Sequence, residues 1–321
     1  MIKITFNEYQ LGKREQISLG KETAYGTGVT PTDILGLNAK VSSPDFNYAW
    51  QEVLSAGADT RAVESFETSH KTAKFTMEFT PVNWKFLQYV GLGVADAGGP
   101  AYTHTFTLAN TIQSFTLQWA KRRSAANHVI TAKGCIITSL NISIKKPTGQ
   151  SGEGFIKVTA QCIAQDWTLG TTVTSISAIT ASPFQFRHFK FTLDNNEITE
   201  VNNADINIDN GVNPEESRYA NATLDQKMGE PIPGVFRING RLSVNTKDST
   251  YDDANDTAAA ISNTKMEFIR GANDDIDFTY ANFIMKSVPC PTNMPGINMT
   301  EIVWSDTFPS SLVATDSIST Y

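Results

Sequence analysis

The clearest pattern in the sequence is a strict alternation of apolar and polar residues between positions 71 and 81. Side chains on a β-strand point alternately to the two faces of its sheet, and burial of each large apolar side chain contributes about 1.5–3 kcal/mol. The segment therefore predicts an antiparallel strand with one dry and one wet face, whose register a one-residue slip would reverse. Ala73, Phe75, Met77 and Phe79 form the dry face, and Thr72, Lys74, Thr76, Glu78 and Thr80 form the wet face.

Residues 234–245 repeat this pattern far downstream. Phe236, Ile238, Leu242 and Val244 alternate there with Arg237, Asn239, Arg241 and Ser243. Shorter runs predict further strands, and turn-forming residues at 145–154 and 194–196 predict two hairpins. These further strands are expected at 37–41, 114–119, 135–144, 155–164, 189–193, 205–209, 265–269, 277–288 and 297–305.

Two helices and two irregular arms complete the expected elements. Residues 82–93 carry an apolar stripe that ends at Gly91 and Gly93, and residues 252–261 predict a weaker, acid-capped helix. Residues 46–70 and 211–233 follow neither period. Loops of that length are uncommon inside a compact domain unless they bind something, so both are predicted to contact partners.

The two halves of the chain show the same order of elements. Each has a short strand, an irregular arm, a long alternating strand, a helix and then further strands, the last of which contains Trp167 or Trp304. We predict an all-β protein with minor α content, made of two tandem β-sandwich-like or barrel-like domains, each with a short flanking helix and a long arm. The alternative is that any two all-β domains show strands at this spacing. The expected division is an N-terminal arm at 1–36, a first domain at 37–182, and a second domain with a C-terminal tail at 183–321.

The composition argues against several classes of protein. The 33 acidic and 26 basic residues give a net charge of −7, which argues against a protein that grips DNA through many phosphates. The three cysteines lack metal or disulfide spacing and are expected to be free, buried thiols. No stretch has the length and apolarity of a membrane span, so the chain is expected in a soluble compartment.

Catalytic and cofactor motifs are also missing. The four histidines have no metal spacing, and His104, between two threonines, is expected at a half-exposed strand position. The sequence contains no nucleophile elbow, zinc-protease or dinucleotide motif. We therefore predict no catalytic residue, no metal and no cofactor.

The chain resembles the major tail tube proteins of long-tailed phages and related viruses. The most specific similarity is Gly-Lys-Glu-Thr-Ala-Tyr-Gly-Thr at 20–27, followed by Pro31, and the strand order supports it across most of the chain. The resemblance implies β-sandwiches in rings stacked into a tube, a lumen lined by long strands, and arms that reach the neighbouring ring. It implies a structural virion protein, made in the host cytoplasm, through whose tube viral DNA passes without specific binding.

The resemblance also implies partners and candidate positions. The partners are copies of the chain and other tail proteins, namely the tape measure, the terminator, and the baseplate or tip; no membrane is involved. If six sandwich units close a ring, a duplicated chain favours a trimer over a hexamer. The lumen candidates are Lys40, Lys74, Thr76, Glu78, Asp205, Asn207, Asp209, Arg237, Asn239 and Arg241. The inter-subunit arm candidates are Arg61, Glu64, Phe66, Glu67, Glu215, Glu216, Arg218 and Tyr219.

A rival hypothesis is a monomeric β-sandwich binding module, carbohydrate-binding or adhesin-like, on a larger assembly. It predicts a concave aromatic platform and a soluble monomer. An enzyme is a third and more distant reading. Electron microscopy separates these hypotheses, because only the first predicts rings or tubes.

Overall fold

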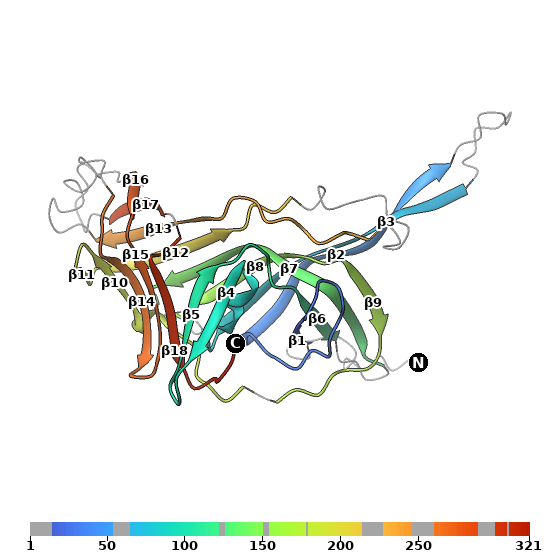
Figure 1. Ribbon diagram of the computed structural model, residues 1–321, viewed down its shortest axis with the longest axis horizontal. Helices are drawn as coiled ribbons and strands as arrows, with labels where there is room; N and C mark the ends of the chain where they lie inside the picture. The colour runs from blue at the N-terminus through green and yellow to red at the C-terminus, as the bar shows by residue number, and fades with distance from the viewer. Residues whose placement is uncertain are drawn as a thin grey trace, which may run out of the picture.

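The chain folds into two antiparallel sheets around an apolar core (Figure 1). The computed structural model describes residues 15–53, 65–121, 126–149, 154–177, 179–213, 227–245, 260–287, 299–306 and 308–321. The first half contains β1 (Glu15–Lys21), β2 (Gly36–Val53), β3 (Ser65–Pro81), the 3-10 helix η3 (Lys85–Tyr89), β4 (Leu92–Ala97), β5 (Tyr102–Leu108), β6 (Phe115–Lys121), β7 (His128–Lys145), β8 (Lys157–Ile163) and β9 (Asp166–Gly170). The second contains the 3-10 helix η4 (Phe186–His188), β10 (Phe189–Leu193), β11 (Asn196–Ile198), β12 (Val201–Asp209), β13 (Arg237–Asn245), β14 (Thr264–Gly271), β15 (Asp274–Tyr280), β16 (Ile284–Ser287), β17 (Met299–Asp306) and β18 (Ser311–Asp316).

One sheet runs through both halves of the chain. Its path is β2-β3-β8-β7-β12-β13-β17-β16, with every neighbour antiparallel, and we call it the long sheet. The two alternating segments found in the sequence, β3 and β13, therefore lie in the same sheet. The halves join where β7 pairs with β12, so no sheet edge separates them. The second sheet, β11-β10-β14-β15-β18-β5-β4, also combines strands from both halves.

The two halves pair their strands in the same order. The long sheet takes the four strands of each half as first, second, fourth and third: β2-β3-β8-β7, then β12-β13-β17-β16. A second series of four paired strands also occurs in both halves. It is β1-β6-β7-β9 in the first half and β10-β14-β15-β18 in the second. In the first half the single strand β7 belongs to both series. In the second half two separate strands, β16 and β15, take its two places. The β4–β5 hairpin has no counterpart and pairs with β18.

The predicted faces of the alternating strands agree with the burial, except that Thr80, predicted on the wet face, is buried. Phe75, Met77 and Phe79 are 2–3% exposed, whereas Lys74 is exposed and Glu78 is only partly covered. In β13, Ile238, Leu242 and Val244 are buried and Arg237 and Arg241 are exposed. The core also crosses between halves, since the ring of Trp84 lies 4.8 Å from that of Phe268.

The helix predicted at 82–93 is wrong. This segment forms only the five-residue 3-10 helix η3, because β3 continues to Pro81 and β4 begins at Leu92. Residues 86–90 are all buried, so the segment is covered on every side and has no wet face of an amphipathic helix. The second predicted helix falls mostly on residues 251–259, outside the described residues.

The first arm is also more regular than predicted. Strands β2 and β3 continue through residues 46–53 and 65–70 and pair as far as Val53 opposite Ser65. This paired ribbon projects from the rest of the protein (Figure 1). One of the three register irregularities of the β2–β3 pair, between Ala49 and Trp50, lies in this arm and shifts the alternation there. In the second arm, residues 211–213 and 227–233 are irregular, as predicted, and 214–226 lie outside the described residues; the strand predicted from 234 begins only at Arg237.

The expectation of a half-exposed His104 is wrong as well. Its side chain is fully buried, with Nδ1 2.7 Å from Asp96 and Nε2 3.2 Å from Asp316. The ring of Tyr321 stacks on the imidazole at 3.6 Å. His104 therefore connects β5 of the first half to β18 of the second. Among the described residues, it belongs to no group of side chains that could hold a metal ion.

Glu22, within the motif at 20–27, has a structural role. Its carboxylate is buried and accepts four hydrogen bonds, from the backbone N–H groups of Gly26 and Gly134 and from the hydroxyls of Ser114 and Thr116, all at 2.8–2.9 Å. Gly134 has φ +61° and lies within β7, between the part that pairs with β9 and the part that pairs with β8. Glu22 therefore fixes the point where β7 passes from one set of strands to the other.

We expect Glu22→Gln to destabilise the protein by about 2 kcal/mol, because whichever oxygen becomes NH₂ then faces a backbone N–H that needs an acceptor. The check is the urea midpoint of the purified protein. Glu301→Gln, at an exposed position, is the control and should change the midpoint little. Equal midpoints for Glu22→Gln and wild type would contradict this role.

Candidate functional site

The polar face of the long sheet is the candidate site. On this face, residues that lie directly opposite one another on neighbouring strands form one row of side chains from β2 to β17. The row consists of Lys40, Glu78, Thr159, Asn141, Asn207, Asn239 and Ser305. None of these residues is buried, while the residues that alternate with them face the core. A continuous polar surface therefore spans both halves.

Charges in the first half of this face are compensated around Glu78. Its carboxylate accepts from the ammonium of Lys40 at 3.1 Å and from that of Lys157. Burial alone would raise the pKa of Glu78, but the two lysines outweigh it and the pKa is lowered. Glu78 therefore stays ionised between two cations at neutral pH.

The second half is compensated by strand register. Asp205 lies opposite Arg241 and Asp209 lies opposite Arg237 on β12 and β13. Arg241 also pairs with Glu301 at 3.3 Å. Where the halves meet, the Asn141 amide donates to Asn207 at 2.6 Å. Opposite charges and neutral amides thus alternate across the middle of the face, so this part of it presents no large field of one sign.

The structure places all ten lumen candidates on this one face. Lys40, Lys74, Thr76 and Glu78 lie on β2 and β3, and the six others lie on β12 and β13. Sequence reasoning missed Asn141, Lys157 and Thr159, which fill the middle of the same face. The signal was present, because polar residues alternate with apolar ones at 139–145, but the strand was read only for its apolar pairing.

Two of the eight arm candidates lie within the described residues. Arg61, Glu64, Glu215, Glu216, Arg218 and Tyr219 lie outside the described residues. Phe66 and Glu67 belong to β3, where their backbones pair with Glu52 and Gln51.

The bases of both arms lie at the same end of the long sheet. Asp166 accepts from Lys71 of β3 at 2.9 Å and lies 3.3 Å from Lys227, which follows the second arm's undescribed part. Burial opposes ionisation of Asp166, but these lysines lower its pKa. One carboxylate therefore ties the two arm bases together.

The part of the chain that the structure describes offers no metal site. It shows no group of His, Cys, Asp and Glu side chains arranged to hold a metal ion, and no helix with the length and apolarity to cross a bilayer. Cys135 and Cys162 are free and buried, as predicted, and burial raises the pKa of both thiols. Cys290 lies outside the described residues.

Comparison with known families decides the identity. The sequence model of the phage tail tube protein family matches residues 12–302. The chain belongs to the phage tail tube protein family. No curated protein matches it. As a family member it is a structural component of the virion tail, and its all-β fold agrees with that assignment.

Two structural features can be set beside the family assignment. The polar face crosses the eight strands of the long sheet that the structure describes. The motif at 20–27, which carried the resemblance, lies away from this face and holds the bend in β7.

We expect the contribution of Glu78 to stability to depend on pH. Since its pKa is lowered in the folded state, that contribution is fully present above about pH 4.3, the ordinary value, and is lost as the pH falls through the folded-state pKa. Glu78→Gln should therefore destabilise the protein at pH 7 and much less at pH 3. Urea unfolding at both pH values tests this, with Glu301→Gln as control; an equal loss at pH 3 would contradict it.

Proposed function

We propose that the protein polymerises into stacked rings that form the tail tube, with the polar face of the long sheet lining the lumen. The observation that supports this most is the single sheet that carries a polar face through both halves. On this proposal the other tail proteins that it contacts are the tape measure, the terminator, and the baseplate or tip. The chain would be made in the host cytoplasm and act in the virion.

The strand directions favour closure of the sheet into a ring. The two edges of the long sheet are β2 and β16, and seven antiparallel pairings lie between them, so these edges run in opposite directions. If copies are related by rotation about an axis that runs roughly parallel to the strands, β16 of one copy lies beside β2 of the next, and the two strands are antiparallel. Such closure removes both exposed edges.

The width of the sheet favours three copies over six. Each chain supplies eight strands, four from each half, so three copies make a 24-stranded barrel. With strands about 4.8 Å apart and tilted by about 40°, this barrel is roughly 50 Å across at the backbone. Barrels of 16–18 strands already hold an aqueous channel, whereas six copies would give a lumen about twice as wide. The repeated strand order supports an internal duplication in which each half acts as one unit of a pseudo-sixfold ring.

The compensated charges suit passage of DNA. Non-specific binding to DNA is driven by release of counterions when lysines and arginines neutralise phosphates. Along the middle of the polar face, Lys40, Lys157 and Arg241 already have a carboxylate partner, so these cations are less available to hold a phosphate backbone. The polyanion would move along such a surface without being retained.

Negative-stain microscopy of the purified protein tests the proposal directly. We expect tubes or rings, and cryo-electron microscopy should show three chains per ring with Glu78 and Asn207 facing the lumen. Compact monomers would favour the binding-module alternative. Strict sixfold rings of identical chains, with residues 186–308 outside the wall, would contradict the three-copy arrangement.

Deletion of residues 50–66 tests the first arm. The core strands lie beyond this segment, so we expect a folded protein with nearly unchanged urea midpoint that no longer forms long tubes. A deletion in the β4–β5 turn, residues 98–100, is a control far from the arm. Tubes of normal length from the 50–66 deletion would show that the arm is dispensable for stacking.

A further inference from the structure

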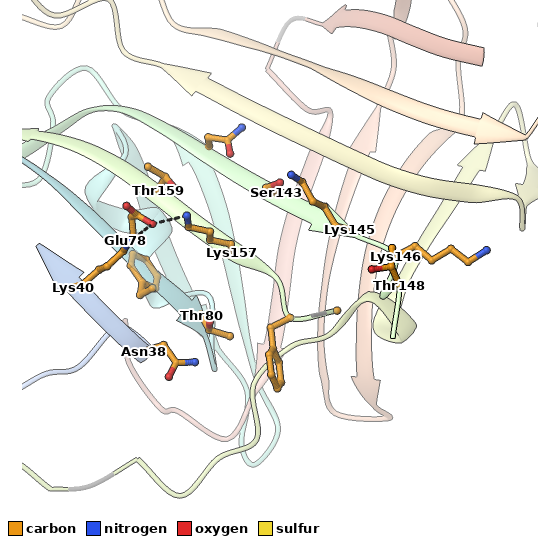
Figure 2. Close-up of a pocket in the computed structure, with 14 residues that line it drawn as sticks. Asn38, Lys40, Glu78, Thr80, Ser143, Lys145, Lys146, Thr148, Lys157 and Thr159 are labelled. Carbon is orange, nitrogen blue, oxygen red and sulfur yellow. Dashed lines mark ion pairs between the residues drawn. The ribbon is translucent and has the colours of Figure 1, made fainter. Parts of the chain in front are cut away.

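A pocket lies at the end of the long sheet that is opposite to the arms. Its volume is about 720 Å³, and it is lined by the start of β2 and β8 and the end of β3 and β7 (Figure 2). The first arm leaves the other end of the same two strands, β2 and β3, after Val53 and before Ser65. The pocket and the arm are thus at opposite ends of one strand pair.

The pocket has an excess of positive charge. Its charged lining residues are Lys40, Lys145, Lys146, Lys157 and Glu78. Lys40 and Lys157 share the single carboxylate of Glu78, as Figure 2 shows for Lys157. Lys145 and Lys146 are exposed, and within the described residues neither ammonium has an ion-pair partner. This end of the sheet therefore offers cations that the protein itself does not neutralise.

The first arm carries the opposite charge. Residues 50–67 contain Glu52, Asp59, Glu64 and Glu67 and a single basic residue, Arg61. The excess of three negative charges equals the excess of three positive charges in the pocket. Copies that stack head to tail along the strand direction would bring the arm end of one to the pocket end of the next.

We propose that the lysine pocket of one copy receives the acidic first arm, residues 50–67, of a second copy in the adjacent ring. The proposal rests on the tube function and specifies its ring-to-ring contact. The contact is heterologous, because the two surfaces differ and lie at opposite ends, and such contacts do not close on themselves but propagate. It gives the tube a direction, since only the head-to-tail arrangement pairs opposite charges.

The position of the pocket favours a protein segment over DNA as the occupant. DNA in the lumen would pass the whole polar face, whereas Lys145 and Lys146, the two pocket lysines without an ion-pair partner among the described residues, lie at one end of it. They lie beside the connection between β7 and β8, which is where an adjacent ring would sit. Along the middle of the face the charges are compensated.

Charge reversal on both sides of the contact tests the proposal. The double variant Lys145→Glu/Lys146→Glu should raise the protein concentration needed for tubes at least about tenfold, because like charges then face each other. Glu64→Lys/Glu67→Lys alone should do the same. Combining all four substitutions should restore assembly to near the wild-type concentration, measured by sedimentation and negative stain.

The controls separate this contact from folding and from the tube itself. Lys190→Glu/Lys265→Glu reverses two lysines of the other sheet and should leave assembly unchanged, and thermal unfolding should show that every variant is folded. Tubes from Lys145→Glu/Lys146→Glu at the wild-type concentration, or failure of the fourfold variant to recover, would overturn the docking while leaving the tube function intact. Absence of tubes from the wild-type protein would overturn both.

Discussion

The structure depends on keeping one face of the long sheet dry and the other wet. Phe75, Ile142, Ile206 and Leu242, on four different strands, are all at most 2% exposed, and the residues beside them carry the polar face. A one-residue slip of any of these strands would exchange the two faces, so burial fixes the register of each strand against its neighbours. The cross-strand pairs of the polar face follow from that register. Burial on one side thus decides the electrostatics on the other.

A second constraint is the bend of β7, which lets one strand serve two sets of pairings. Gly134 takes a left-handed conformation there, and its N–H is satisfied by a carboxylate from a loop more than a hundred residues earlier. A side chain at this position would collide with Gln165 and Tyr25. The second half achieves the same path with two shorter strands, β15 and β16, joined at 281–283. The repeated order therefore has two local solutions, one of which needs Glu22.

Asymmetry between the two ends of the long sheet connects the fold to assembly. Both arms leave one end, where Asp166 links Lys71 and Lys227, and the lysine pocket lies at the other. A subunit whose ends differ in shape and charge is suited to stack in one direction. Because the lateral edges β2 and β16 are strands, contacts around a ring and contacts between rings would use different chemistry, backbone hydrogen bonds in the first case and side-chain charge in the second.

The sequence by itself determined the two-faced strands, since alternation is a local property: the burial of β3 and β13 and the pairing of Ile142 with Val158 follow from it. The family resemblance was also readable, from residues 20–27. Only the tertiary structure decided what depends on distant neighbours. The apolar stripe at 82–93 resembles a helix, but burial on all sides leaves it a single 3-10 turn. His104 looks like an ordinary strand residue until β18 and Tyr321 enclose it. Residues 46–53 and 65–70 show no clean alternation, and they form a ribbon because the two strands pair with each other, which a local pattern does not encode.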